Sequence, residues 1–234
     1  MKELENQKSN VKKVEKKEKT NTFTQKHSKT IKILVFILLV ILLIYVIIIM
    51  RRAIIMTLLS EKAKEKQVAT NYYVKQYNYL EDTFVITESY HLENDYLTIH
   101  TWYSDDKDME KIISYRKGEE KISILETKGR KYILDANTVV GENILPVTYV
   151  SDGFIANLQY AILVGVEPAN CKGKECYVIK GDGYERYVDK ETGLAVREIE
   201  EDQIKDFTIT FDVVKDTDIV KPDTTDAIMY VQNK

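Results

Sequence analysis

The sequence is poor in the side chains that most often build catalytic and metal sites. Of its 234 residues only two are cysteine and three are histidine. A zinc site needs about four Cys or His ligands close together, whereas Cys171 and Cys176 lie far along the chain from His91 and His100. The C-x-x-C redox motif, the G-x-S-x-G nucleophile elbow and a Ser/Cys–His–Asp set are all missing. We therefore expect no enzymatic activity, no metal site and no cofactor.

The sequence does contain one long apolar run. Ile33–Met50 is a stretch of 18 consecutive apolar residues without glycine, proline or charge. At about 1.5 Å per residue, a helix of this length reaches roughly 27 Å, close to the ~30 Å hydrocarbon core of a bilayer. The core helix of a soluble protein is seldom apolar on every side for five turns. The run therefore predicts a transmembrane helix at residues 31–52.

The residues around the run indicate a retained anchor. A secretory signal peptide has a shorter apolar region, about 7–15 residues, which ends in a small-residue cleavage site. Here a leading segment of 30 residues precedes the helix, and Arg51 and Arg52 follow the apolar run directly. No cysteine lies near the run, which excludes lipoprotein processing. The lipid bilayer is accordingly the first partner that the sequence predicts.

Charge favours one orientation of this anchor. Eight Lys lie in residues 11–32, against five Lys or Arg in residues 51–70. Positive residues near the ends of a span prefer the cytoplasm. Residues 1–32 carry a net charge of +6, and residues 53–234 carry −11. We expect a single-pass protein of the cell membrane with a cytoplasmic N-terminus and an extracytoplasmic C-terminal domain. The acidic domain argues against binding nucleic acid, which requires a basic face.

Composition divides the rest of the chain into segments. Residues 1–30 are too polar to bury a core, so they are expected to form a disordered basic tail. Residues 53–80 are expected to form a juxtamembrane helix, because Val68 and Tyr72 are spaced to share a helical face. Residues 81–225 form the predicted extracytoplasmic β domain, and residues 226–234 form a C-terminal tail.

The β domain is predicted from short runs of alternating apolar and polar residues separated by turn residues. In FTITFDVV, Phe207, Ile209, Phe211 and Val213 are expected to face the interior. One helix at about 151–165 interrupts the strands, with Ser151 or Asp152 as its N-cap and Gly165 at its end. Strands and helices do not alternate as in a parallel sheet, so the predicted class is α+β with an antiparallel sheet. The clearest early strands are 83–90, 96–103, 111–115 and 121–127.

The two cysteines flank a short predicted hairpin loop. Residues 172–175 would bring Cys171 and Cys176 opposite each other. In an oxidising exterior the pair can form a disulfide, whereas in a reducing habitat both remain thiols. The sequence favours the disulfide.

Three stretches carry a resemblance to a known family: GKECYVI (Gly173–Ile179), YVDKETGLAVREIE (Tyr187–Glu200) and FTITFDVVKDTDIVKPD (Phe207–Asp223). They resemble the outer-membrane lipoprotein carrier superfamily, which also holds periplasmic sensors. The likeness is greatest to membrane-anchored relatives of Gram-positive, clostridial type. The resemblance implies an antiparallel half-barrel with helices on its concave side.

The resemblance also implies a function. In the family the concave cavity holds acyl chains, or the domain recognises a partner. We therefore expect a membrane-anchored binding module for a lipid, a lipoprotein or another apolar ligand. An envelope sensor or protein-interaction protein, regulatory or structural, is the alternative. No ligand-contacting residue of the family can be matched to a position in this sequence, and the sequence predicts no oligomeric state.

Overall fold

The computed structural model describes residues 2–80, 83–104, 110–134, 145–146 and 153–230, with side chains from Lys29 onward. The chain divides into two compact units, Met1–Arg51 and Arg52–Lys234.

Helix α1 spans Lys2–Gln67 and supplies the whole of the first unit. The backbone is thus helical from Lys2 onward, where we expected a disordered tail. Lys, Glu and Gln are good helix formers, and neither Gly nor Pro occurs before Gly118. Almost every apolar side chain from Ile31 to Met50 is exposed. Within the described residues, Lys29–Gln67 is the one helix long and apolar enough to cross a membrane.

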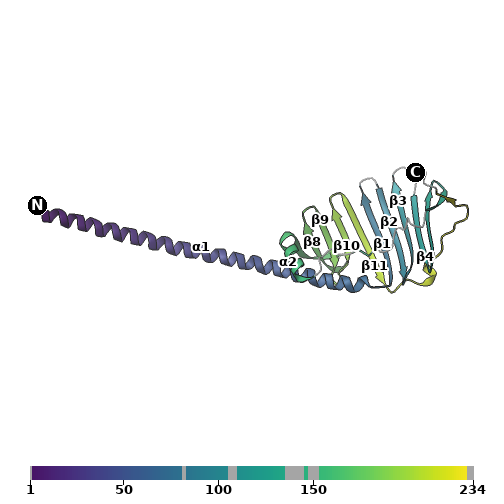
Figure 1. Ribbon diagram of the computed structural model, residues 1–234, viewed down its shortest axis with the longest axis horizontal. Helices are drawn as coiled ribbons and strands as arrows, with labels where there is room; N and C mark the ends of the chain where they lie inside the picture. The colour runs from purple at the N-terminus through teal and green to yellow at the C-terminus, as the bar shows by residue number, and fades with distance from the viewer. Residues whose placement is uncertain (1, 81–82, 105–109, 135–144, 147–152, 231–234) are drawn as a thin grey trace. The chain divides into compact units, whose positions relative to one another are not determined.

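The second unit is built on one large open sheet (Figure 1). Its strands lie in the order β12-β6-β5-β4-β3-β2-β1-β11-β10-β9-β8-β7. Every pairing is antiparallel except that of β12 with β6. The predicted α+β class with an antiparallel sheet is confirmed. The bounds are β1 Asn71–Leu80, β2 Thr83–Leu92, β3 Asp95–Ser104, β4 Glu110–Lys117, β5 Glu120–Thr127, β6 Arg130–Leu134, β7 Gly165–Cys171, β8 Lys174–Gly181, β9 Tyr184–Asp189, β10 Ala195–Glu200, β11 Gln203–Phe211 and β12 Ile228–Met229.

The boundary between helix and sheet differs from the prediction. The helix expected to run to residue 80 ends at Gln67, and Asn71–Leu80 is a central strand paired with β2 and β11. Tyr72 and Val74 are buried on one face of β1. Aromatic and β-branched residues suit a strand that is covered on both faces, and this packing overrides the helical spacing of Val68 and Tyr72. In the predicted C-terminal tail, Ile228 and Met229 form a short strand.

In β11 the predicted alternation of inward and outward side chains is present as far as Phe211. Asp212 then adopts a φ of 58°, which breaks the two-residue period. As a result Val214, instead of the predicted Val213, is buried. It joins Leu97, Ile113, Tyr115 and Ile219 in a cluster on one face of the sheet.

Helix α2, Phe154–Leu163, is shorter than the predicted helix at 151–165. Gly165 is the first residue of β7 and does not cap the helix; Val164 already has an extended backbone. Ser151 and Asp152, the predicted N-cap residues, lie outside the described residues, and Gly153 occupies that position. Asn157 Nδ2 donates to Thr57 Oγ1 of α1 at 3.0 Å, so α2 packs against the end of α1 in this unit.

The end of α1 also packs against the sheet. Ala63 forms a buried cluster with Tyr72, Val74 and Leu194, to which Ile209 and Phe211 contribute. This cluster defines the helix-bearing face of the sheet. The Val214 cluster lies on the opposite face, because Tyr73 of that cluster alternates with Tyr72 and Val74 along β1.

Candidate ligand pocket

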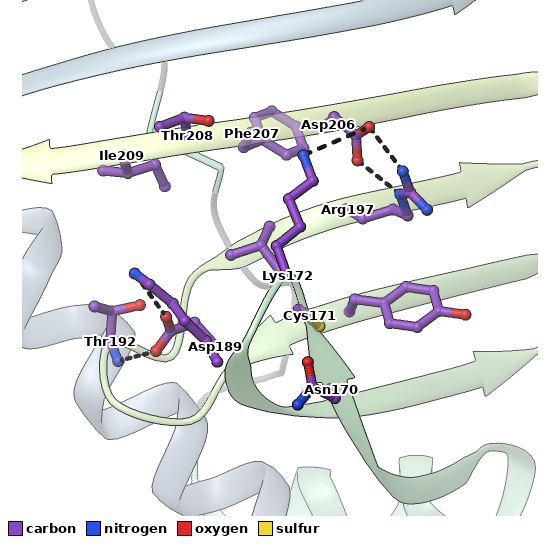
Figure 2. Close-up of a pocket in the computed structure, with 13 residues that line it drawn as sticks. Asn170, Cys171, Lys172, Asp189, Thr192, Arg197, Asp206, Phe207, Thr208 and Ile209 are labelled. Carbon is purple, nitrogen blue, oxygen red and sulfur yellow. Dashed lines mark hydrogen bonds and ion pairs between the residues drawn. The ribbon is translucent and has the colours of Figure 1, made fainter.

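A pocket of about 510 Å³ lies at the end of the sheet where the β7–β8 hairpin turns (Figure 2). It combines apolar, cationic and carboxylate side chains. Most of the lining side chains are polar or charged. The lining residues are Asn170, Cys171, Lys172, Lys174, Tyr187, Asp189, Thr192, Val196, Arg197, Asp206, Phe207, Thr208 and Ile209.

Strand register places the polar part of this lining on the face opposite α1. Arg197 is aligned with Tyr187 on one side and with Asp206 on the other, so all three share a face. Thr208 lies on that face too, two residues after Asp206. Phe207 and Ile209, which also line the pocket, alternate with these residues along β11 and belong to the helix-bearing face.

The strongest interaction in the pocket joins Arg197 and Asp206. Arg197 Nε and Nη2 donate to the two carboxylate oxygens of Asp206 at 2.7 and 2.8 Å, a bidentate pair. The guanidinium holds the pKa of Asp206 below its usual range, and the hydrogen bond to Asp206 raises the pKa of Arg197. Asp206 is nearly buried and stays ionised, which fixes the guanidinium at the pocket wall.

Two lysines of the hairpin loop complete the charged lining. Lys172 Nζ lies 4.0 Å from Asp206, and Lys174 Nζ lies 3.6 Å from Asp189. Both lysine side chains are mostly exposed. Three cations therefore face two carboxylates, an excess of one positive charge that leaves the pocket suited to an anionic group.

Asp189 also organises the turn that borders the pocket. Its Oδ1 accepts hydrogen bonds from the backbone N–H groups of Glu191 and Thr192, at 2.7 and 3.0 Å. Such Asx turns stabilise tight connections. The turn ends at Gly193, where a Cβ atom would lie 2.1 Å from the carbonyl oxygen of Leu59 in α1. The D-K-E-T-G motif thus joins the pocket to the helix.

Cys171 and Cys176 lie diagonally across the β7–β8 hairpin. The register aligns Cys171 with Lys174 and Cys176 with Ala169, whereas the sequence suggested that the two cysteines lie directly opposite each other. Their Cα atoms are 6.0 Å apart, a separation that a disulfide spans, and their sulfur atoms are placed as a bonded pair. The bond would enclose Lys172 and Lys174 in one small ring. Asn170 Oδ1 accepts the Gly173 N–H at 2.9 Å, which further fixes this loop.

The helix-bearing face of β2–β5 contains buried polar residues as well as apolar ones. Register aligns four buried hydroxyl residues in one row across these strands: Ser89, Thr98, Ser114 and Ser123. His91 and His100 lie on the same face. His91 stacks on Tyr72 at 4.5 Å, and His100 Nδ1 shares a hydrogen bond with Thr87 Oγ1 at 2.8 Å. Burial lowers the pKa of both histidines, that of His91 to about 4.

Within the described residues no cluster of three or more His, Cys, Asp or Glu is arranged to hold a metal ion. Of the pocket residues, the sequence singled out Cys171 alone as a candidate. The pair Arg197–Asp206 carried a signal that we did not use. Only Glu201 and Asp202 separate β10 from β11, so the hairpin register places Arg197 opposite Asp206.

No family model matches the chain, and no curated protein is significantly similar to it. Among solved structures, an uncharacterised conserved protein from Thermus thermophilus is similar at 10% identity and a TM-score of 0.41, over 74% of this chain and 97% of that one. MucB is similar at 11% sequence identity and a TM-score of 0.37, and the match covers 74% of this chain and 63% of MucB. MucB in complex with MucA(peri) is similar at 11% sequence identity and a TM-score of 0.33, and the match covers 69% of this chain and 57% of that one.

The chain thus spans less than two thirds of MucB, which has the fold of the lipoprotein carrier type. The clostridial branch of the resemblance finds no support in these similarities. All three TM-scores are below 0.5, so the function has to be argued from the geometry of the chain itself.

Proposed function

We propose that this chain is a membrane-anchored, non-enzymatic binding module. Its sheet unit binds an amphiphile, a lipid or the lipid-bearing part of a lipoprotein, with the anionic group in the pocket beside Lys172, Lys174 and Arg197. The observation that carries the proposal is the excess of positive charge in the pocket, where Lys172, Lys174 and Arg197 lie beside Asp189 and Asp206. This excess suits the anionic group of an amphiphile.

The anchor places this module at the membrane. The exposed apolar side chains of Ile33–Met50 form a surface that water does not solvate well, and lipid covers such a surface without cost to the backbone, whose hydrogen bonds are all internal to the helix. The basic tail lies in the cytoplasm and the sheet unit lies outside the cell membrane. A ligand of this module therefore reaches it within or beside the bilayer.

Photocrosslinking with a diazirine-bearing fatty acid tests the proposal. The full chain is incorporated into phosphatidylglycerol nanodiscs, irradiated with the probe and digested, and the labelled peptides are mapped by mass spectrometry. We expect label on peptides that contain residues 170–174 and 196–209. Label in the membrane helix provides an internal measure of probe delivery.

A pair of variants on one strand gives the control. Thr208 lines the pocket, and Thr210 is exposed on the same face two residues further along β11. Thr208→Trp fills the pocket and should abolish the label there, whereas Thr210→Trp should retain it. Label in the membrane helix without label at the pocket, or equal labelling of the two variants, would overturn the proposed lipid site and favour a protein-interaction module.

A further inference from the structure

Helix α2 exposes an apolar face that the sheet unit does not cover. Ile155 and Leu163 are 74% and 77% exposed, and Phe154 and Ile162 are exposed beside them. The whole helix, FIANLQYAIL, contains no charged residue. Monomeric soluble proteins seldom leave neighbouring large aliphatic side chains in water.

This face is not an unfinished core contact. Asn157 and Ala161 are completely buried and occupy the other side of α2, where Asn157 bonds Thr57 of α1. Because α2 already has its packing partner, Ile155 and Ile162, seven residues apart, form a stripe that points away from it. The stripe therefore requires a separate explanation.

Helix α1 adds to the same kind of surface. Ile54 and Leu58, one turn apart, are exposed on the segment of α1 against which α2 packs. They follow Met50, the end of the apolar run, by four and eight residues, which corresponds to about 6 and 12 Å along a helix. An interfacial helix buries its apolar face about 5–10 Å into the boundary between headgroups and acyl chains. Because Ile54 and Leu58 belong to the same helix as the apolar run, they remain within about 12 Å of its end along the helix.

We propose that α2, together with Ile54 and Leu58, docks into the interface of the membrane that α1 crosses. The occupant of the apolar stripe is then the lipid surface of the leaflet nearest the sheet unit. The inference rests on the anchor described under the proposed function, but it does not depend on the pocket or its ligand. Through this docking α2 becomes a second attachment, so the sheet unit is held at the bilayer by more than one helix.

Site-specific fluorescence in the full chain tests the docking. An environment-sensitive fluorescent amino acid replaces Leu163, and the protein is incorporated into nanodiscs with or without lipids that carry a doxyl quencher near the headgroup. Genetic incorporation leaves both native cysteines in place. The quencher should remove most of the emission at this position.

Val68 gives a matched control, because it is an aliphatic residue that is also 77% exposed but lies 18 residues beyond Met50. The same fluorophore at Val68 should keep its emission. Equal emission losses at positions 163 and 68, or none at either, would overturn the interfacial docking.

A third position separates this result from a failure of the anchor. Leu42 lies at the middle of the apolar run. A fluorophore there that is quenched by a doxyl group deep in the acyl chain confirms insertion. If Leu42 is quenched and Leu163 is not, the docking is wrong and the anchor stands; if Leu42 is not quenched, the anchor itself is wrong.

Discussion

Gly193 meets two physical requirements that other residues cannot meet together. Its φ of +71° lies in the left-handed region, and its Cβ position is occupied by the backbone of α1, 2.1 Å from the Leu59 oxygen and 2.7 Å from the Ala63 nitrogen. The second requirement is the stricter one, because a helix backbone cannot move aside as a flexible side chain can. This single residue therefore determines how closely the pocket turn approaches the helix.

We expect Gly193→Ala to lower the free energy of unfolding by about 2–4 kcal/mol, the sum of left-handed strain and overpacking. Gly129→Ala is the matched control, since Gly129 has a φ of +72° with no heavy atom within 4 Å of its Cβ position. It should cost only about 1 kcal/mol. Urea unfolding of the detergent-solubilised chain, followed by the fluorescence of Trp102, measures both. Equal losses would show that the contact with α1 contributes nothing.

His91 makes stability depend on pH. Its pKa is lowered to about 4 in the folded chain by burial, from an ordinary value of 6.5 in the unfolded chain. Between these values the unfolded chain binds a proton that the folded chain does not, so stability falls as the pH falls from about 6.5 to 4. At about 1.4 kcal/mol per pKa unit, the loss reaches about 3 kcal/mol.

His91→Phe retains the stack on Tyr72 and removes the titrating group. Between pH 6.5 and 4, the urea concentration at the unfolding midpoint should change less in the variant than in the wild-type chain. Burial lowers the pKa of His100 too, so His100 also reduces stability as the pH falls. Some pH dependence of the midpoint should therefore remain in the variant. An unchanged slope in the variant would exclude His91 as a source of the pH dependence.

At the scale of elements, the β7–β8 hairpin has the most direct consequence for the pocket. Its loop carries both lysines, and it is tied to the next turn by the ion pair of Lys190 with Glu175 at 2.7 Å. The strands of this hairpin are short, and β7 is the edge of the sheet. A covalent link between Cys171 and Cys176 restricts the loop more than these contacts can.

We predict that Cys171 and Cys176 form a disulfide. The double variant Cys171→Ser, Cys176→Ser should then have a free energy of unfolding lower by about 2 kcal/mol, the value expected for so short a ring. Dithiothreitol should produce the same loss in the wild-type chain and none in the double variant. Non-reducing mass spectrometry provides the second measurement. Two alkylatable thiols in protein taken from the cell surface would show that the bond is not formed there.

Local sequence patterns predicted strands β2–β5 but not strand β1. The β2–β5 strands were predictable because each alternates along its own length and ends at a short turn. Strand β1 was not, because the spacing of Val68 and Tyr72 indicated a helix that continues to residue 80. Only pairing with β2 and β11, from distant parts of the chain, decides between the two.

At the scale of the whole chain, membrane insertion in one direction is the main expectation. In protoplasts of cells that express the chain with different epitope tags at its ends, external protease should remove the C-terminal tag and leave the N-terminal tag intact. The protein should also remain in the membrane pellet after alkaline carbonate extraction. Loss of the N-terminal tag from intact protoplasts would reverse the orientation, and release by carbonate would exclude the anchor.

The sequence by itself determined the properties that depend on local composition and period. The apolar run Ile33–Met50 and the two-residue alternation of each strand can both be recognised from consecutive residues, without knowledge of what packs against them. The antiparallel class followed from the same local patterns.

Tertiary structure decided everything that depends on residues distant along the chain. The pocket joins the loop at 170–174 to strands that begin more than ten residues later, and Gly193 acquires its role from a helix 130 residues before it. The exposed stripe of α2 can be recognised only once Asn157 and Ala161 are known to face α1. An apolar side chain has the same sequence signature whether protein, lipid or water surrounds it, so its surroundings had to come from the fold.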